Sequence, residues 1–318
     1  MMHKKWLQIL AVLFLCILLL YGCGKKTDEP PVINPAEEQP EPDPDPEEPL
    51  EDPEITLEKV TPACVVIDNH AAARPHSGLQ EATIVYEFLA EGGISRLMAV
   101  FDRVLDEGLV IGPVRSLRPY FAETALEYGG AVMYSGMSFR TEQLIAGMPL
   151  KKISADKYFW RDKNRKAPHN LYTDLGKLYD GRGPSDVEIV KFLPAELPPG
   201  EEGRELEVVY SKDTVIRYTY DEECKSYLRF HGSTPHTDRE TGEQYRATRV
   251  IVRKNRHTDV ENGLVNIDLD GSGTAVLYEL GQKYDITWEK TGGKTSYRFA
   301  DGTEVDLRAG TTWIQVVR

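Results

Sequence analysis

The segment from 27 to 54 limits where this chain can fold. It contains twelve acidic residues, nine of the chain's twenty prolines and no basic residue. Because proline favours extended conformers and like charges repel, we expect this segment to form no core and to act as a stalk. Binding of its acidic residues to a basic partner or to cations is the alternative. A folded body must therefore be built from the residues that follow.

The charge of the chain is concentrated in the same segment. The 318 residues have a formal net charge of −13. From Ile55 onward, 34 basic and 39 acidic residues remain, a net charge of −5. The body is thus only mildly acidic and has no basic footprint, so we expect no nucleic-acid partner.

The N-terminus has the order of an export signal. Two lysines precede an apolar run from Trp6 to Leu20, which is short for a membrane-spanning helix. The residues that follow resemble a bacterial lipobox, which implies a signal peptide over 1–22 and two acyl chains on Cys23 as the membrane anchor. An uncleaved signal anchor is the alternative. Both interpretations place the body on the outer face of the cytoplasmic membrane, with 23–54 as the stalk.

After the stalk the pattern predicts two domains. Residues 55–190 alternate apolar strands with helical stretches, which is typical of a mixed α/β (α+β) domain. A linker rich in proline and glycine follows at 191–203, and 204–318 then predicts a mainly antiparallel β domain, either a sandwich or a barrel. The predicted helices are 116–128 with Ser116 as N-cap, 139–146, and 173–179 with Thr173 as N-cap; the predicted strands are 64–68, 83–89, 94–101, 131–134, 206–210, 214–220, 226–231, 245–253, 275–279, 284–289, 295–299 and 311–317.

Two cysteines remain once Cys16 and Cys23 are assigned to the export segment. A disulfide between Cys64 and Cys224 would tie the two domains together in an oxidising compartment. Cys64 lies in an apolar strand, so a small buried hydrophobic residue is the other interpretation, and the one that we favour. The sequence has no zinc spacing, and we expect neither a metal nor a cofactor.

Polar residues gather at strand and helix ends of the first domain. Arg115 and Arg118 flank the start of a predicted helix, where positive charge opposes the helix dipole. An external anion would explain them, and so would ion pairs with Glu87 or Glu91. The ligand-binding candidates are Asn69, Arg74, Arg96, Arg115, Arg118 and Asn170.

Two histidines are candidates for acid–base chemistry. His70 follows the first strand and His169 lies in a loop, and imidazole can exchange protons near neutral pH. Glu87 or Glu91 would be the carboxylate partner, whereas a purely structural role for His169 is the alternative. The sequence contains no G-x-S-x-G, H-E-x-x-H, Walker or G-x-G-x-x-G motif, so it leaves open whether the protein is an enzyme.

The second domain offers fewer candidates. Its long loop over 232–244, with His236 and Asp238, is expected to be functional and could reach the site of the first domain. Trp288 and Trp313 fall in predicted strands, where core packing is favoured over protein docking.

Several motifs together resemble the YerB-like lipoproteins of Gram-positive bacteria. The resemblance covers nearly everything after the stalk and implies a surface lipoprotein of two domains, with no catalytic residues to transfer. The motifs are Val65–His70 with Arg74-Pro75, Tyr86–Arg96, Gly112–Pro119, Ala167–Tyr172 and Gly310–Val316.

Two classes of function follow from the sequence. The first is an envelope module, anchored by lipid, that binds an anionic or glycan component of the cell wall or a partner protein. The second is a hydrolase or transferase acting on wall polymers, with the histidines and glutamates of the first domain as its acid–base groups.

Overall fold

The computed structural model describes residues 54–105, 108–129, 131–153, 158–176, 187–193, 196–260 and 263–318. The predicted signal peptide, the lipidation site Cys23 and nearly all of the stalk lie outside these residues, as does the end of the predicted helix 173–179. Within the described part of the chain, no helix is long and apolar enough to cross a membrane.

Strands outnumber helices among the described elements. The helices are α2 (Pro119–Glu127) and α3 (Phe139–Leu144), with short 3-10 turns η1 (Ala71–Ala73), η2 (Leu79–Glu81) and η3 (Glu91–Gly93). The strands are β1 (Ile55–Asp68), β2 (Ile84–Leu89), β3 (Ser95–Arg103), β4 (Val110–Ile111), β5 (Ala131–Met133), β6 (Lys151–Ile153), β7 (Phe159–Arg161), β8 (Leu171–Asp174), β9 (Glu188–Phe192), β10 (Glu201–Glu202), β11 (Glu205–Ser211), β12 (Thr214–Asp221), β13 (Ser226–His231), β14 (Thr234–Pro235), β15 (Arg246–Ala247), β16 (Arg249–Lys254), β17 (His257–Asp259), β18 (Val265–Ile267), β19 (Gly271–Glu279), β20 (Gln282–Thr291), β21 (Lys294–Arg298) and β22 (Thr312–Val317).

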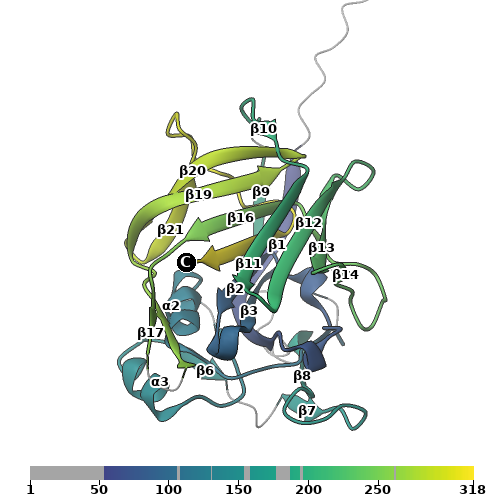
Figure 1. Cartoon of the computed structure of the whole chain (residues 1–318), viewed down its shortest axis with the longest axis vertical. Coiled ribbons are helices and arrows are strands. Elements are labelled where there is room, and N and C mark those ends of the chain that lie inside the picture. Colours follow the sequence, from purple (N-terminus) through teal and green to yellow (C-terminus); the bar gives the residue numbers. More distant parts are fainter. Residues whose placement is uncertain are drawn as a thin grey trace, which may run out of the picture. The chain divides into compact units, whose positions relative to one another are not determined.

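One mixed sheet contains strands from both predicted domains (Figure 1). Its order is β10-β20-β19-β16-β22-β2-β3-β1-β5-β6, with β21 beside β20 and β9 beside β1. The last strand, β22, runs parallel to both β16 and β2 and joins the strands of the two halves. The predicted boundary at 191–203 therefore separates two stretches of sequence whose strands share one sheet.

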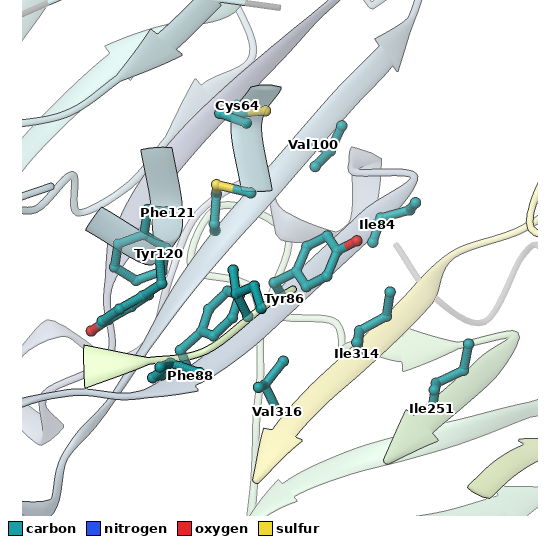
Figure 2. Packing of buried hydrophobic residues seen from close by; sticks show 14 of the residues in the cluster. Cys64, Ile84, Tyr86, Phe88, Val100, Tyr120, Phe121, Ile251, Ile314 and Val316 are labelled. Atoms are coloured by element: carbon teal, nitrogen blue, oxygen red, sulfur yellow. The ribbon is translucent and has the colours of Figure 1, made fainter. Parts of the chain in front are cut away.

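Both faces of the large sheet are covered. On one face lies a smaller antiparallel sheet, β11-β12-β13-β14 with β15 beside β13; its Ile216 and Tyr218 pack in one cluster with Val85 and Trp313 of the large sheet. On the other face, α2 packs its buried side over β2 and β3. Figure 2 shows Tyr120 and Phe121 of α2 close to Phe88, with Ile314 and Val316 of β22 in the same cluster.

The fold class predicted from the sequence is confirmed: a mixed sheet in the first half and antiparallel pairing in the second, with few helices. Trp288 and Trp313 are buried in the core. Cys64 and Cys224 are free thiols, and Cys64 is fully buried.

Two local predictions were wrong. Ser116 does not cap α2, because its hydroxyl donates to the Ser135 carbonyl instead; Arg118 is the N-cap residue and Pro119 begins the helix. Thr173 is not the N-cap of a helix but lies in β8, which pairs with β4 and β7; the helical residues begin after this strand, at Leu175 and Gly176. Only the predicted start of this helix was therefore wrong, because Thr173 pairs as a strand residue.

Candidate functional site

Asp68 is the centre of the candidate site. It ends β1, a strand in the interior of the large sheet, and its side chain is almost completely buried. Its Oδ2 atom lies 2.7 Å from Nδ1 of His169 and 3.3 Å from Nε of Arg115, and its Oδ1 atom accepts the backbone N–H of His70 at 3.1 Å. We call Asp68, His70, Arg115 and His169 the Asp68 cluster.

The two imidazoles of the cluster lie face to face. The ring centroids of His70 and His169 are 4.5 Å apart, with an interplanar angle of 14°. Nδ1 of His70 accepts the N–H of Ala72, so its Nε2 carries the ring proton. An ionised carboxylate can only accept, so Nδ1 of His169 carries the proton that faces Asp68, and Nε2 of the neutral ring keeps a lone pair. The pair thus offers one donor and one acceptor side by side.

The loop between β7 and β8 positions His169. Asn170 holds this loop from inside: its Oδ1 accepts from Arg161 at 2.7 Å, and its Nδ2 donates to the carbonyls of Asp162 and Arg165. Arg165 then donates to the carbonyls of Ala73 and Pro75, which fixes the loop against the segment after His70. The amide of Asn170, a predicted ligand group, is therefore occupied within the protein.

Arg96 and Arg118 share one carboxylate. Glu91 lies 3.3 Å from Nη2 of Arg96 and forms a close ion pair with Arg118. Partial burial alone would raise the pKa of Glu91, but the hydrogen bond from Arg118 and the charge of Arg96 lower it below its ordinary value. Arg118 is thus neutralised inside the protein, whereas Arg115 lies in the Asp68 cluster.

Glu87 is buried and paired with an arginine, so its carboxylate is not available as an acid–base group in an open site. Its carboxylate accepts from Nη2 of Arg229 at 2.8 Å, and both side chains are fully buried. Asn69 and Ser95 donate to the other carboxylate oxygen at 3.0 and 2.5 Å. Glu87 is thereby the partner of a buried arginine that sequence analysis did not select.

Arg229 belongs to a closed ring of hydrogen bonds. Its Nε donates to Nδ1 of His236 at 2.9 Å, the Nε2 of His236 lies 2.6 Å from Nδ1 of His76, and Nε2 of His76 lies 2.6 Å from the Asp68 carbonyl. The peptide bond from Asp68 to Asn69 closes the ring, because Nδ2 of Asn69 donates to the Glu87 carboxylate, which also accepts from Arg229. We call this the buried ring; its members are Asp68, Asn69, His76, Glu87, Arg229 and His236.

The ring fixes the protonation of its histidines. Nδ1 of His236 must accept from the Arg229 guanidinium, so the ring proton of His236 is on its Nε2. Nδ1 of His76 accepts that proton, so the ring proton of His76 is on its own Nε2. Burial lowers the pKa of His76 to about 3, against the effect of the bond to the Asp68 carbonyl. Burial also lowers the pKa of His236 well below its ordinary value. Both imidazoles are neutral in the folded protein.

The loop 232–244 reaches the first half of the chain, as predicted. Asp238 accepts the N–H of Gly78 and the hydroxyl of Tyr245, each at 2.7 Å, and Arg239 donates its N–H to the His76 carbonyl. His236 is buried in the ring, so the loop contributes to the candidate site through contacts in the interior. His76, Arg229 and Tyr218 were missed because isolated residues of two distant segments carry no local motif.

Two cavities of the described chain are lined by residues outside the Asp68 cluster. One of about 490 Å³ is lined by Pro198–Glu201, Lys283–Asp285 and Phe299–Asp301, and one of about 270 Å³ by residues that include Glu81, Val110, Glu243 and Tyr245. Within the described residues, no group of three or more histidine, cysteine or carboxylate side chains is arranged to hold a metal ion.

The fold and the sequence together define a family. The profile described as "Protein of unknown function (DUF3048) N-terminal domain" matches residues 50–187, and the corresponding C-terminal domain matches 206–314. The chain belongs to this DUF3048 family.

A relative from Bacillus subtilis extends over the whole chain. It is named "Putative lipoprotein YerB" and is 30% identical over 331 residues, which covers 99% of this chain and 96% of the relative. The crystal structure of the YerB protein from Bacillus subtilis matches with a TM-score of 0.70 and 28% identity, over 81% of this chain and 91% of that one. The similarity thus holds in sequence and in fold.

Proposed function

We propose that the protein is a lipoprotein of the cell envelope whose Asp68 cluster binds an anionic group of a wall polymer. In this proposal Cys23 is diacylated and the stalk holds the body at the outer face of the cytoplasmic membrane. The order of the N-terminal segment supports the anchor, and so does the name lipoprotein given to the relative YerB.

The excess of arginine around Asp68 carries the binding proposal. Among the described residues, Arg96, Arg115 and Arg118 have two carboxylate partners between them, Asp68 and Glu91. The Arg115 side chain is 28% exposed, and its carboxylate partner Asp68 is also the partner of His169. A local positive charge on a chain with a net charge of −13 is explained by an anionic ligand. Of the two stacked imidazoles, His70 has its proton on Nε2 and can donate it to such a group.

Titration of the full chain with a poly(glycerol phosphate) oligomer and with a neutral glycan tests this function. Arg115→Gln should weaken oligomer binding about 10- to 100-fold, the usual effect of losing one charge-assisted hydrogen bond. The matched control is Arg217→Gln, which removes an exposed arginine paired with Glu207. Equal affinities for the two variants, or equal binding of the neutral glycan, would refute the assignment.

A hydrolase or transferase is the second candidate, favoured by the Asp68–His169 hydrogen bond of 2.7 Å. A carboxylate that orients an imidazole through Nδ1 leaves Nε2 free for proton transfer. Glu87 and Glu91 are engaged by arginines, so any such chemistry would depend on His169 and His70. Incubation of peptidoglycan with wild type and His169→Ala, read by mass spectrometry, tests it: new fragments should form with wild type alone, and their absence rejects turnover.

The anchor is tested separately. Cys23→Ser should abolish palmitate incorporation and move the protein from the membrane fraction to the medium. Retention in the membrane without palmitate would support the uncleaved signal anchor instead.

A further inference from the structure

The cavity of about 490 Å³ is built by residues of the linker and of the second half of the chain. Three segments enclose it: the end of the predicted linker, the start of β20 and the turn that follows β21. Ligand pockets in proteins commonly have volumes of about 300–1,000 Å³. The cavity is therefore large enough for a ligand, and the proposed function does not use it.

Two aromatic rings form a fixed part of the cavity wall. The rings of Tyr284 and Phe299 meet edge to face with centroids 5.5 Å apart, and both side chains are buried. The hydroxyl of Tyr284 donates to Oε1 of Gln282 at 2.9 Å, and the same oxygen accepts the N–H of Gly200 at 2.8 Å. A Cβ atom at Gly200 would lie 2.6 Å from the Tyr284 ring, so the main chain packs directly against this ring. The wall is thus formed before a ligand binds, which lowers the cost of binding.

The charged residues of the cavity are mostly acidic. The lining has three carboxylates and one ammonium group, which gives a net charge of −2. The ammonium group, of Lys283, lies 3.0 Å from Glu201. Asp285 and Asp301 are exposed, and among the described residues no basic side chain lies within 4.0 Å of either carboxylate. The N–H of Thr303 donates to Asp301 at 2.8 Å and lowers the pKa of that carboxyl, so Asp301 is ionised at neutral pH.

This charge selects the kind of occupant. An anion would be repelled, and so would the stalk of the chain itself, because segment 27–54 has twelve acidic residues and no basic one. Among the described residues, no group of three or more ligating side chains is arranged for a metal ion. Carboxylates beside aromatic rings suit an organic cation, since the rings attract an ammonium group through their faces and pack against its carbon stem.

The place of the cavity in the fold indicates where such a cation comes from. Glu201 lies in β10, the outermost strand at one end of the large sheet, and β20 is the strand that pairs with it in the described part of the chain. An outermost strand has main-chain N–H and C=O groups on its free edge, and an extended peptide can pair with them. A peptide at this edge would lie beside the cavity.

We propose that this cavity binds a lysine-type side chain of a peptide. The ammonium group lies near Asp285 and Asp301, the four-carbon stem packs against the two aromatic rings, and the main chain of the peptide follows β10. This site does not rest on the proposed function. It shares no residue with the Asp68 cluster, and its ligand has the opposite charge.

Calorimetric titration of the full chain at low ionic strength tests the proposal. The ligand is a tripeptide with lysine between two alanines, blocked at both ends, and the matched ligand is the same peptide with the lysine Nε acetylated. Wild type should bind the lysine peptide saturably. Acetylation should weaken binding about 10-fold, because it removes the charge that faces two carboxylates and the rings.

Two variants test the carboxylates. Asp285→Asn and Asp301→Asn should each weaken binding of the lysine peptide about 2- to 5-fold, and the double variant about 10-fold. Asparagine at 301 keeps an oxygen that can accept the N–H of Thr303, so the turn is retained. The control is Asp213→Asn, which removes an exposed carboxylate that does not line the cavity and should leave the affinity unchanged.

The proposal is overturned if wild type shows no saturable binding of the lysine peptide, or if the double variant binds it as Asp213→Asn does. Equal binding of the acetylated peptide would reject the cation and indicate a neutral ligand. An affinity for 1,5-diaminopentane as high as that for the peptide would reject the peptide as the source and indicate a free amine. Arg115→Gln should bind the lysine peptide as wild type does, so failure of this site leaves polymer binding at the Asp68 cluster as a separate question.

Discussion

Acidification should destabilise the join between the two halves, because the buried ring holds two neutral imidazoles. The folded protein keeps His76 unprotonated until the pH falls to about 3, although an unfolded chain would protonate this histidine below about 6.5. A proton on either ring nitrogen that accepts would place two N–H groups against each other. Protonation therefore requires the ring to open.

The magnitude follows from this difference in pKa. The stabilisation is fully present above about pH 6.5 and is lost as the pH falls toward about 3. Within that window, each imidazole that stays neutral in the folded protein makes the free energy of unfolding decrease by about 1.4 kcal/mol for each unit by which the pH falls. At about pH 5 the loss is about 2 kcal/mol for His76, and about 4 kcal/mol when His236, whose pKa burial lowers in the same direction, is included. This is a large part of the ~5–15 kcal/mol that stabilises a typical domain.

Urea unfolding at several pH values between about 7.5 and 5, followed by tryptophan fluorescence, measures this effect. His76→Gln should lower the slope of the unfolding free energy against pH by about 1.4 kcal/mol per unit, since one proton fewer is taken up. The control is Tyr218→Phe, which removes a 2.6 Å hydrogen bond to Arg229 without adding or removing a group that titrates in this range. The decrease in the free energy of unfolding caused by Tyr218→Phe should be the same at every pH. A wild-type free energy that does not change between pH 6.5 and 5 would refute the neutral ring.

Three further outcomes follow from burial and packing. Glu87→Gln leaves the fully buried Arg229 without a counter-ion and should cost about 3–5 kcal/mol in urea unfolding, whereas Glu207→Gln in an exposed pair should cost less than about 1 kcal/mol; similar costs would contradict the burial argument. Gly112→Ala should lower the unfolding midpoint clearly, because its φ is +152° and a Cβ would lie 2.8 Å from the ring of Tyr172; an unchanged midpoint would reject this contact. Burial raises the pKa of the Cys64 thiol, so in a Cys23→Ser background only the partly exposed Cys224 should react with a thiol reagent before unfolding, and rapid reaction of both thiols would contradict the packing.

Periodicity was sufficient to predict the strands, but not how they combine. The alternation over 214–220 and the apolar run at 64–68 predicted β12 and the end of β1, because a strand's exposure pattern is local. The place of β22 between β2 and β16 depends on pairing across more than 200 residues, which no window of sequence contains. Thr173 was assigned to a helix for a similar reason: β8 is short, and only its partners make it a strand.

The site was predicted in part. His70, His169 and Arg115 were selected at strand and loop ends, and the structure brings them together around Asp68. Glu87 was selected as a carboxylate partner and Asn170 for its place beside His169, and both make internal contacts in the structure. The sequence around a glutamate in an apolar strand is the same whether its side chain faces a cleft or a buried arginine. Deciding between these two roles for Glu87 required the position of Arg229.

The buried ring and the shared sheet make the two halves depend on each other. Strand β22 pairs with both β2 and β16, and Arg229 of the second half is the ion-pair partner of the fully buried Glu87. The second half therefore acts on the Asp68 cluster without touching it: His236 and His76 fix the Asp68 carbonyl, and Glu87 fixes the Asn69 amide. Because these two residues are consecutive, their main chain is held from both sides, which orients the Asp68 carboxylate toward His169 and Arg115.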